Sequence, residues 1–160
     1  MKEIPLTQGY VALVDDEDYE AVSQYRWSVM KGCNTRYAKR AALRGDGGRT
    51  TQLMHRFIVD ASGLEVDHID GNGLNNQRSN LRLATRSENG RNIPRRSDNT
   101  SGYKGVYWEP ERGKWRCQIK VGGKRVRVAR FDDLVEAALA YDRFAKEFHG
   151  EFAWLNFPEN

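Results

Sequence analysis

One polar segment limits what this chain can fold into. Apart from Pro94, residues 94–101 contain no apolar side chain, and their content of Arg, Asn, Asp and Ser is typical of a linker. The chain has 160 residues, so the stretches on either side of this segment are short. Short stretches bury small cores, and we therefore expect an α+β fold made of small units.

Residues 102–158 have the clearest periodicity in the sequence. Between residues 114 and 121, apolar side chains alternate with Lys, Arg and Gln, which is typical of a strand with one buried and one cationic face. Residues 103–108 and 124–131 are two further predicted strands. Together these three segments predict an antiparallel sheet.

A helical pattern follows the three predicted strands. Asp133 and Glu136 fit a capping box, apolar residues then recur with a helical period, and Gly150 ends the pattern. The apolar stripe of this helix can cover the buried face of the sheet, where we place Trp115. Trp108 could lie on either face. The predicted module is a three-stranded antiparallel sheet packed on one helix.

Residues 1–54 are predicted to be a small β-rich scaffold. A Gly-rich turn between residues 36–42 and 49–54 predicts a hairpin, which could carry a basic face. Ahead of it, Asp15 or Asp16 is placed to cap a short helix. No catalytic role is assigned to this part of the chain.

Charge is distributed unevenly along the chain. The net charge is only +4, but residues 91–130 hold twelve basic and three acidic side chains. Residues 131–160 hold two basic and seven acidic ones. A basic face can serve solubility alone, yet this concentration is typical of a surface that binds phosphates, and it favours a nucleic-acid partner.

The sequence favours a reducing cytoplasm over a membrane or an oxidising compartment. No apolar run approaches the roughly 20 residues of a membrane-spanning helix, and residues 1–5 lack a signal-peptide pattern. Cys33 and Cys117 are far apart in sequence, and neither belongs to a Cys-x-x-Cys pair. We expect both to be buried thiols.

Residues 65–93 carry the candidate chemistry, in the predicted order strand, Asn/Gly-rich loop, strand, helix. Asp67 and His68 are adjacent, Asn80 follows His68 by twelve residues, and Asn89 follows Asn80 by nine. Phosphodiester hydrolysis needs a base to activate water and a cation to neutralise charge on the phosphate. Asp and Asn oxygens suit Mg²⁺ or Mn²⁺ better than Zn²⁺. The alternative is an ordinary surface turn, in which Asp, Asn and Gly are common.

The same residues resemble the HNH endonucleases, whose ββα unit holds one divalent metal. The matching positions are Asp67 and His68, residues 70–72, Asn75 and Asn76, residues 79–82, and Glu88 and Asn89. The resemblance implies that His68 is the general base and that Asp67 and Asn89 are metal ligands. It also implies that Asn80 steadies the loop and the His68 ring. Mg²⁺ is the expected ion, with Mn²⁺ as the second choice.

Two other histidines have no chemical role in this scheme. His55 lies in a segment that similar proteins also carry, and we expect it to pack in the core or contact a phosphate. His149 stands at the end of the predicted C-terminal helix, where a cation suits the helix dipole. We expect His149 to be structural.

Residues 102–158 resemble the AP2 domain, on the strength of residues 102–106, 113–115, 137–142 and 155–158. In that family the sheet lies in the DNA major groove. The resemblance assigns DNA contacts to Lys104, Tyr107, Trp108, Arg112, Lys114, Arg116, Lys120, Arg125, Arg127 and Arg130. Lys104 and Lys120 replace Arg of the plant proteins, and Arg127 replaces a frequent Trp. The plant sequence preference is therefore not transferred, because Lys lacks the bidentate guanine contact of Arg.

These observations predict four segments: a scaffold (1–54), an HNH nuclease unit (55–93), a linker (94–101) and an AP2-like domain (102–158). The predicted protein is a monomeric, metal-dependent endonuclease of double-stranded DNA, in the cytoplasm of a bacterial or phage-infected cell. It would cut one strand or both. The alternative is a non-catalytic AP2-type DNA-binding regulator with a decayed nuclease fold. An RNA-binding protein fits less well, because aromatic pairs placed to stack unpaired bases are missing from the AP2-like sequence.

Overall fold

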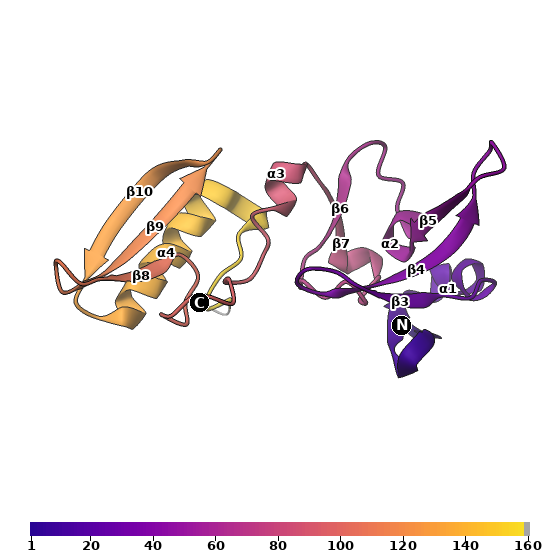
Figure 1. The fold of residues 1–160 in the computed structure, drawn as a ribbon, viewed down its shortest axis with the longest axis horizontal. Helices are drawn as coiled ribbons and strands as arrows, with labels where there is room; N and C mark the ends of the chain where they lie inside the picture. The colour runs from indigo at the N-terminus through magenta and orange to yellow at the C-terminus, as the bar shows by residue number, and fades with distance from the viewer. Residues whose placement is uncertain (159–160) are drawn as a thin grey trace. The chain divides into compact units, whose positions relative to one another are not determined.

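The computed structural model describes residues 1–158, which form two compact units (Figure 1). The first unit runs from Met1 to Arg86 and the second begins at Ser87. Each combines small antiparallel sheets or hairpins with short helices, so the expected α+β class of small units holds. Within residues 1–158, no helix combines the length and the apolar character needed to cross a membrane.

The first unit is a set of short strands and helices. Two strands form a hairpin, three form a meander, and the last two form the hairpin that carries Asp67 and His68. The elements are β1 (Lys2–Pro5), β2 (Val11–Val14), α1 (Asp16–Ser23), β3 (Ser28–Lys31), β4 (Arg36–Leu43), β5 (Arg49–Leu53), α2 (Met54–Ile58), β6 (Glu65–His68) and β7 (Leu81–Ala84). Two 3₁₀ turns, Thr7–Gly9 and Arg78–Asn80, complete it.

A single apolar cluster joins the scaffold to the β6–β7 hairpin. Val14, Val22 and Met54 are fully buried in it, and Val66 of β6 and Leu81 of β7 pack into the same cluster. Because the hairpin has only two strands, it would be marginal without this packing. The scaffold therefore holds the hairpin in place through the hydrophobic core.

The second unit contains one sheet covered by one long helix. The sheet has the order β10–β9–β8 and is antiparallel throughout. Cys117, Ile119 and Val106 face Ala137, Ala138 and Tyr141 of the helix. The elements are β8 (Val106–Glu109), β9 (Lys114–Val121), β10 (Lys124–Phe131), α4 (Leu134–His149) and a 3₁₀ turn, Gly150–Phe152. A short helix, α3 (Arg86–Asn89), begins at the division between the two units.

The predicted helix signals of this unit are confirmed. The Asp133 side chain accepts a hydrogen bond from the backbone N–H of Glu136, 2.8 Å away, as a capping residue does. Gly150 ends α4 with a φ of 56°, a left-handed value that favours glycine. Trp115 packs against the core, as expected.

Two expectations about single residues are wrong or incomplete. Cys117 is buried, but Cys33 is exposed in the turn between β3 and β4, where polar neighbours leave no apolar core to cover it. Asp15 does precede α1, yet its side chain makes no cap hydrogen bond. Its carboxylate binds a distant loop instead, because that loop offers two donors.

Candidate functional site

The β6–β7 hairpin places Asp67 and His68 at its end. In the antiparallel register, Asp67 lies opposite Arg82 and His68 lies opposite Leu81. Arg82 donates from Nε and Nη2 to Asp67 Oδ2, at 2.8 and 2.7 Å. Both side chains are largely buried, with Asp67 only 4% exposed. A paired and buried carboxylate is held in one orientation, which a metal ligand requires.

Asn80 closes the loop that follows His68. Its side-chain Oδ1 accepts from the backbone N–H of Asp70 at 3.0 Å, and its Nδ2 donates to Asp70 Oδ1 at 2.9 Å and to the Asn75 carbonyl at 2.8 Å. The backbone N–H of Ile69 also donates to the Asn80 carbonyl at 2.9 Å. A buried amide with these partners fixes both ends of the loop.

His68 has a buried partner that the sequence analysis did not identify. Its Nε2 lies 3.4 Å from Oδ1 of Asn76, which is fully buried and whose Nδ2 donates to the Leu74 carbonyl at 3.1 Å. Burial lowers the pKa of His68, although the contact with Asn76 and the charges of Asp70 and Asp67 oppose that shift. Burial therefore favours the neutral form of His68, which is the form that a general base needs.

Two aromatic rings, one from β4 and one from α2, pack against His68. The His55 ring packs edge-on against it with centroids 4.9 Å apart, and Tyr37 lies 5.8 Å from His68 and 5.7 Å from His55. Burial, followed by the nearby charges of His68 and Arg56, lowers the pKa of His55 to about 3. His55 thus packs at the candidate site as a neutral ring, one of the two roles expected for it.

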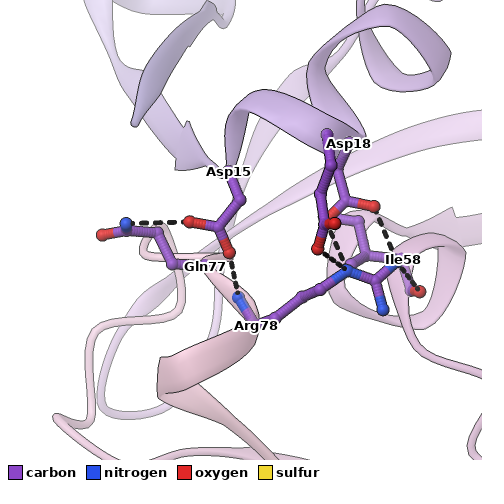
Figure 2. Close-up of polar contacts among 6 residues, drawn as sticks. Asp15, Asp18, Ile58, Gln77 and Arg78 are labelled. Carbon is purple, nitrogen blue, oxygen red and sulfur yellow. Dashed lines mark hydrogen bonds and ion pairs between the residues drawn. The ribbon is translucent and has the colours of Figure 1, made fainter.

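Scaffold residues far away in sequence hold the loop that leads to Asn80. Figure 2 shows Asp15 and Asp18 of the α1 region reaching Gln77 and Arg78. Asp15 accepts from Gln77 Nε2 at 3.1 Å and from the backbone N–H of Arg78 at 2.8 Å. Arg78 donates from Nε and Nη2 to both oxygens of Asp18, at 2.8 Å each. The hydrogen bonds from Gln77 and from the backbone N–H of Arg78 keep the pKa of Asp15 below its usual range.

The backbone of the scaffold also pairs with this loop. In β2, the N–H of Leu13 donates to the Leu74 carbonyl, and the Leu13 carbonyl accepts from the N–H of Asn76, both at 2.8 Å. Gly73 lies against β4 so closely that a Cβ atom would fall 2.4 Å from the Arg36 carbonyl oxygen. Residues 72–78 are therefore fixed from several sides, and Asn76 is held beneath His68.

Carboxylate and amide oxygens are donors that suit Mg²⁺, and the two expected ligands belong to different units, Asp67 to the first and Asn89 to the second. Asp67 supplies a buried carboxylate, and Asn89, the other expected ligand, is the last residue of α3. Within residues 1–158, no group of three or more His, Cys, Asp and Glu side chains could hold a metal ion. Mg²⁺ does not require such a group, because one or two protein oxygens, water and substrate phosphate commonly complete its shell.

The second unit has a cationic sheet face opposite α4. Cross-strand neighbours on this face are Tyr107, Arg116 and Arg130 in one row and Lys120 with Arg125 in another. Lys114 shares the same face of β9 by strand alternation. The structure therefore brings together six of the ten residues predicted to bind DNA.

The carboxylate of Glu109 forms ion pairs with three arginines at this face. Glu109 lies within 3.6 Å of Arg112, within 3.5 Å of Arg116 and within 2.5 Å of Arg130. The hydrogen bond from Arg130, together with the charges of the three arginines, holds the pKa of Glu109 below its usual range. Glu109 stays ionised and restricts the rotamers of the three guanidinium groups. Arg112 joins this group from the turn between β8 and β9.

Three predicted DNA contacts point elsewhere. Arg127 pairs with Ile119 because a register shift precedes it, and it reaches Glu147 of α4 at 3.6 Å. Trp108 pairs with Trp115 rather than with the cationic row, and remains 46% exposed. Lys104 donates its ammonium hydrogens to backbone carbonyls of the preceding segment. Neither the register shift before Arg127 nor the contacts of Trp108 and Lys104 can be predicted from the alternation of side chains along a strand.

His149 is structural, and its burial disfavours the cation expected at a helix end. Its Nε2 lies 3.0 Å from the Lys120 carbonyl, and burial lowers its pKa. The nearby charges of Arg91 and Lys104 lower it further. This hydrogen bond joins His149, at the end of α4, to β9.

Comparison with known proteins gives the same order of domains along the chain as the sequence predicted. The sequence model of the HNH endonuclease family matches residues 57–91, and that of the AP2 domain matches residues 101–151. Protein 3.8 of Escherichia phage T7 is 44% identical over 91 residues, which cover 57% of this chain and 74% of that protein. An uncharacterized HNH endonuclease, L560, of Acanthamoeba polyphaga mimivirus is 32% identical over 157 residues, covering 93% of this chain and 76% of that protein.

Shorter stretches of the chain are also similar to plant proteins. Dehydration-responsive element-binding protein 2C of Arabidopsis thaliana is 47% identical over 49 residues, which cover 29% of this chain and 14% of that protein. No solved structure matches the chain.

Proposed function

This chain belongs to the HNH endonuclease family, and on that premise we propose that it is a metal-dependent enzyme that hydrolyses phosphodiester bonds in double-stranded DNA. An HNH endonuclease domain is followed along the chain by an AP2 DNA-binding domain. The observation that carries the proposal is the buried His68, held by Asn76, beside the paired carboxylate of Asp67. A decayed nuclease would not need to keep this arrangement.

His68 is proposed to act through Nδ1. Asn76 Oδ1 accepts the hydrogen of His68 Nε2 in the tautomer that this contact favours, which leaves the lone pair on Nδ1. A water molecule loses its proton to Nδ1 as its oxygen bonds to phosphorus and the bond from phosphorus to the leaving oxygen breaks. Asn76 and Asn80 keep the ring and the loop in place during the transfer.

Asp67 and Asn89 are the proposed ligands of a divalent ion, with Mg²⁺ preferred and Mn²⁺ accepted. When bound, the ion would neutralise the charge that develops on the phosphate and on the leaving oxygen. Arg82 fixes the Asp67 carboxylate through two hydrogen bonds, which keeps one carboxylate rotamer available to the metal.

The cationic face of the β8–β10 sheet is proposed to hold the duplex. Arg116, Lys120 and Arg125 share that face, and Lys120 and Arg125 are exposed. Each phosphate contact releases a counterion, so binding should weaken steeply with salt. Site preference would come from arginines that reach base edges in the major groove.

The test is to incubate the full chain with supercoiled plasmid and Mg²⁺. We expect nicked or linear DNA, no product in excess chelator, and recovery when Mg²⁺ or Mn²⁺ is restored. His149→Gln is the matched histidine control and should cleave like the wild type. DNA binding without cleavage under every metal condition would contradict the nuclease and favour the non-catalytic regulator. Equal cleavage in chelator would contradict the metal mechanism.

A further inference from the structure

Basic side chains are concentrated in one part of the first unit. Residues 26–56, which include β3, β4, β5 and the start of α2, hold eight basic side chains and one acidic one. Residues 1–25 hold one basic and six acidic side chains. Among the eight cations, Arg44 alone forms an ion pair within the described residues 1–158, with Asp46. Seven cations without a carboxylate partner favour an anionic ligand on this part of the unit.

Two of these cations, Arg40 and Arg56, line the same hollow. It has a volume of about 620 Å³ and lies where the β4–β5 hairpin meets α2 (Figure 1). Arg40 is half-buried, whereas Arg56 is exposed. Gln52 lies opposite Arg40 in the register of the two strands, and Thr50, two residues before it, shares that face. The lining within residues 1–158 contains no carboxylate, so the hollow offers positive charge and hydrogen-bond donors to a ligand.

Aromatic rings hold the Arg40 guanidinium without satisfying its hydrogen-bond donors. Its Cζ lies 3.6 Å from the centroid of the Tyr25 ring, 5.4 Å from that of Phe57 and 5.7 Å from that of Trp27. A ring face attracts the cation, but the N–H bonds of a guanidinium point outward in its own plane. The Nε atom of Arg40 is buried and has no hydrogen-bond partner within residues 1–158. An arginine that only supported the fold would normally be paired at this depth, because an unsatisfied buried donor is destabilising.

A phosphate group supplies what this hollow lacks. The Oε1 atom of Gln52, across from Arg40, is also buried without a hydrogen-bond partner in the described part of the chain. Two phosphate oxygens match the planar donor edge of a guanidinium, and the second cation, Arg56, adds charge attraction. A water molecule held by the phosphate can donate to Gln52 Oε1. A bound phosphate would thus satisfy both buried atoms.

The hollow lies on the same elements that pack against His68. Arg56 directly follows His55 in α2, and Arg40 follows Tyr37 by three residues in β4. The rings of His55 and Tyr37 both pack against that of His68. Three residues of a strand span about 10 Å, which is the rise of about three base pairs of duplex DNA. Arg40 is therefore placed to meet a phosphate within a few nucleotides of one that is held at His68.

We propose that Arg40 and Arg56 form a binding site of the nuclease unit for a phosphate of the DNA backbone, separate from the cationic face of the β8–β10 sheet. The inference rests on the proposed function, because the DNA bound here is the substrate of that nuclease. Free phosphate has the same chemistry as this ligand. The backbone is the favoured source, because the hairpin carries two more exposed cations, Arg44 and Arg49, which a polyanion can contact and one small ion cannot.

The experiment measures the affinity of the full-length protein for a short DNA duplex in excess chelator, where no strand is cut. Fluorescence anisotropy at several salt concentrations gives the affinity and its salt slope. We expect Arg40→Met and Arg56→Met each to weaken binding about tenfold at low salt and to lower the salt slope by up to about one unit. Arg40→Met keeps the apolar stem over the aromatic rings. Arg56 is exposed, so Arg56→Met remains informative if Arg40→Met fails to fold.

The double variant, Arg40→Met with Arg56→Met, tests whether the two arginines share one phosphate. Losses that act on one ligand are not additive, so it should lose much less than about a hundredfold, the product of the two single losses. Its salt slope should fall by about one unit, because one phosphate contact is lost. A loss equal to the product, with a slope lowered by about two units, would show two separate surface contacts and overturn the shared site.

Lys31→Met is the matched control, because Lys31 is an exposed cation of β3 outside the hollow. It should keep the affinity and the salt slope of the wild type. A loss equal to that of Arg56→Met would show that charge anywhere on this sheet is sufficient, and would overturn the proposal.

Two further measurements separate this site from its alternatives. Thermal unfolding is followed with and without inorganic phosphate at constant ionic strength. If phosphate stabilises the wild type but not Arg56→Met, while both bind DNA equally, the ligand is free phosphate and the proposal is overturned. Cutting of plasmid by the wild type, together with unchanged DNA affinity in both single variants, overturns the site and leaves the nuclease standing. Weaker DNA binding by the variants, with no cutting by the wild type, supports the site and contradicts the proposed nuclease.

Discussion

The loop from His68 to Asn80 and the cationic face of the β8–β10 sheet are both polar, but their side chains are held differently. In the loop, Asn76 and Asn80 are buried, and Asn80 satisfies three partners. On the sheet, Lys120 and Arg125 are exposed. Proton transfer requires fixed geometry within fractions of an ångström, whereas attraction of phosphates depends mainly on charge.

The largest effect that this comparison predicts is at His68. His68→Ala should lower the rate of plasmid nicking by about 10²–10⁴-fold, because it removes the general base. DNA affinity in a gel-shift assay should remain that of the wild type, since most binding energy is placed on the sheet. Cleavage at the wild-type rate would show that the buried loop is not the catalytic region.

Asn80→Ala tests whether burial makes the loop rigid. Three hydrogen bonds are lost, and Asp70 and Asn75 are left with unsatisfied groups, so we expect a loss of about 1–3 kcal/mol in unfolding free energy. Asn72→Ala, at an exposed position of the same loop, should cost less. Urea denaturation measures both variants, and equal losses would contradict the difference between buried and exposed amides.

His55, which packs against His68, predicts that the unfolding free energy of the protein depends on pH. Its pKa is about 3 in the folded protein and about 6.5 when unfolded, so below pH 6.5 the unfolded chain binds a proton that the folded protein does not. Stability should therefore fall as the pH drops from 6.5 toward 3.

Comparison with His55→Phe isolates this contribution, because His68 remains in both proteins. The variant should lose stability less steeply, by up to about 1.4 kcal/mol per pH unit. Urea denaturation between pH 7 and pH 4.5 gives the two slopes. Parallel curves would show that His55 takes up its proton while the protein is folded.

The smallest effect is predicted for the sheet. Lys120→Met should reduce the slope of log affinity against log salt by about one unit and leave the nicking rate at saturating protein unchanged. Lys31→Met, an exposed lysine of the first unit, is the control and should not change the slope. Equal changes of the salt slope in the two variants would show that the DNA-binding surface extends beyond the β8–β10 sheet and the Arg40–Arg56 site.

Local patterns in the sequence predicted much of the architecture and part of the candidate site. The alternation in residues 114–121 and the capping pair Asp133 and Glu136 led to a sheet covered by one helix, as observed. Asp67 and His68 were identified because they are adjacent and precede Asn80 at a recognisable spacing. Such signals depend on residues close in sequence, whose geometry is set by backbone periodicity.

Other features depend on contacts between distant segments. Asp18 meets Arg78, and Tyr37 and His55 meet His68, only after β2, α1, α2 and β4 have packed around one core.

The sequence by itself determined the order of strands and helices, the basic sheet and the Asp67–His68 pair, because each follows from local spacing and charge. Only the tertiary structure decided that Asn76 is the partner of His68, that Arg127 turns toward α4 and that Lys104 binds the Arg91 and Ile93 carbonyls. These outcomes depend on loop closure, on a register shift and on which buried acceptors lie within reach of a side chain. None of these three features can be deduced from residues that are neighbours in the sequence.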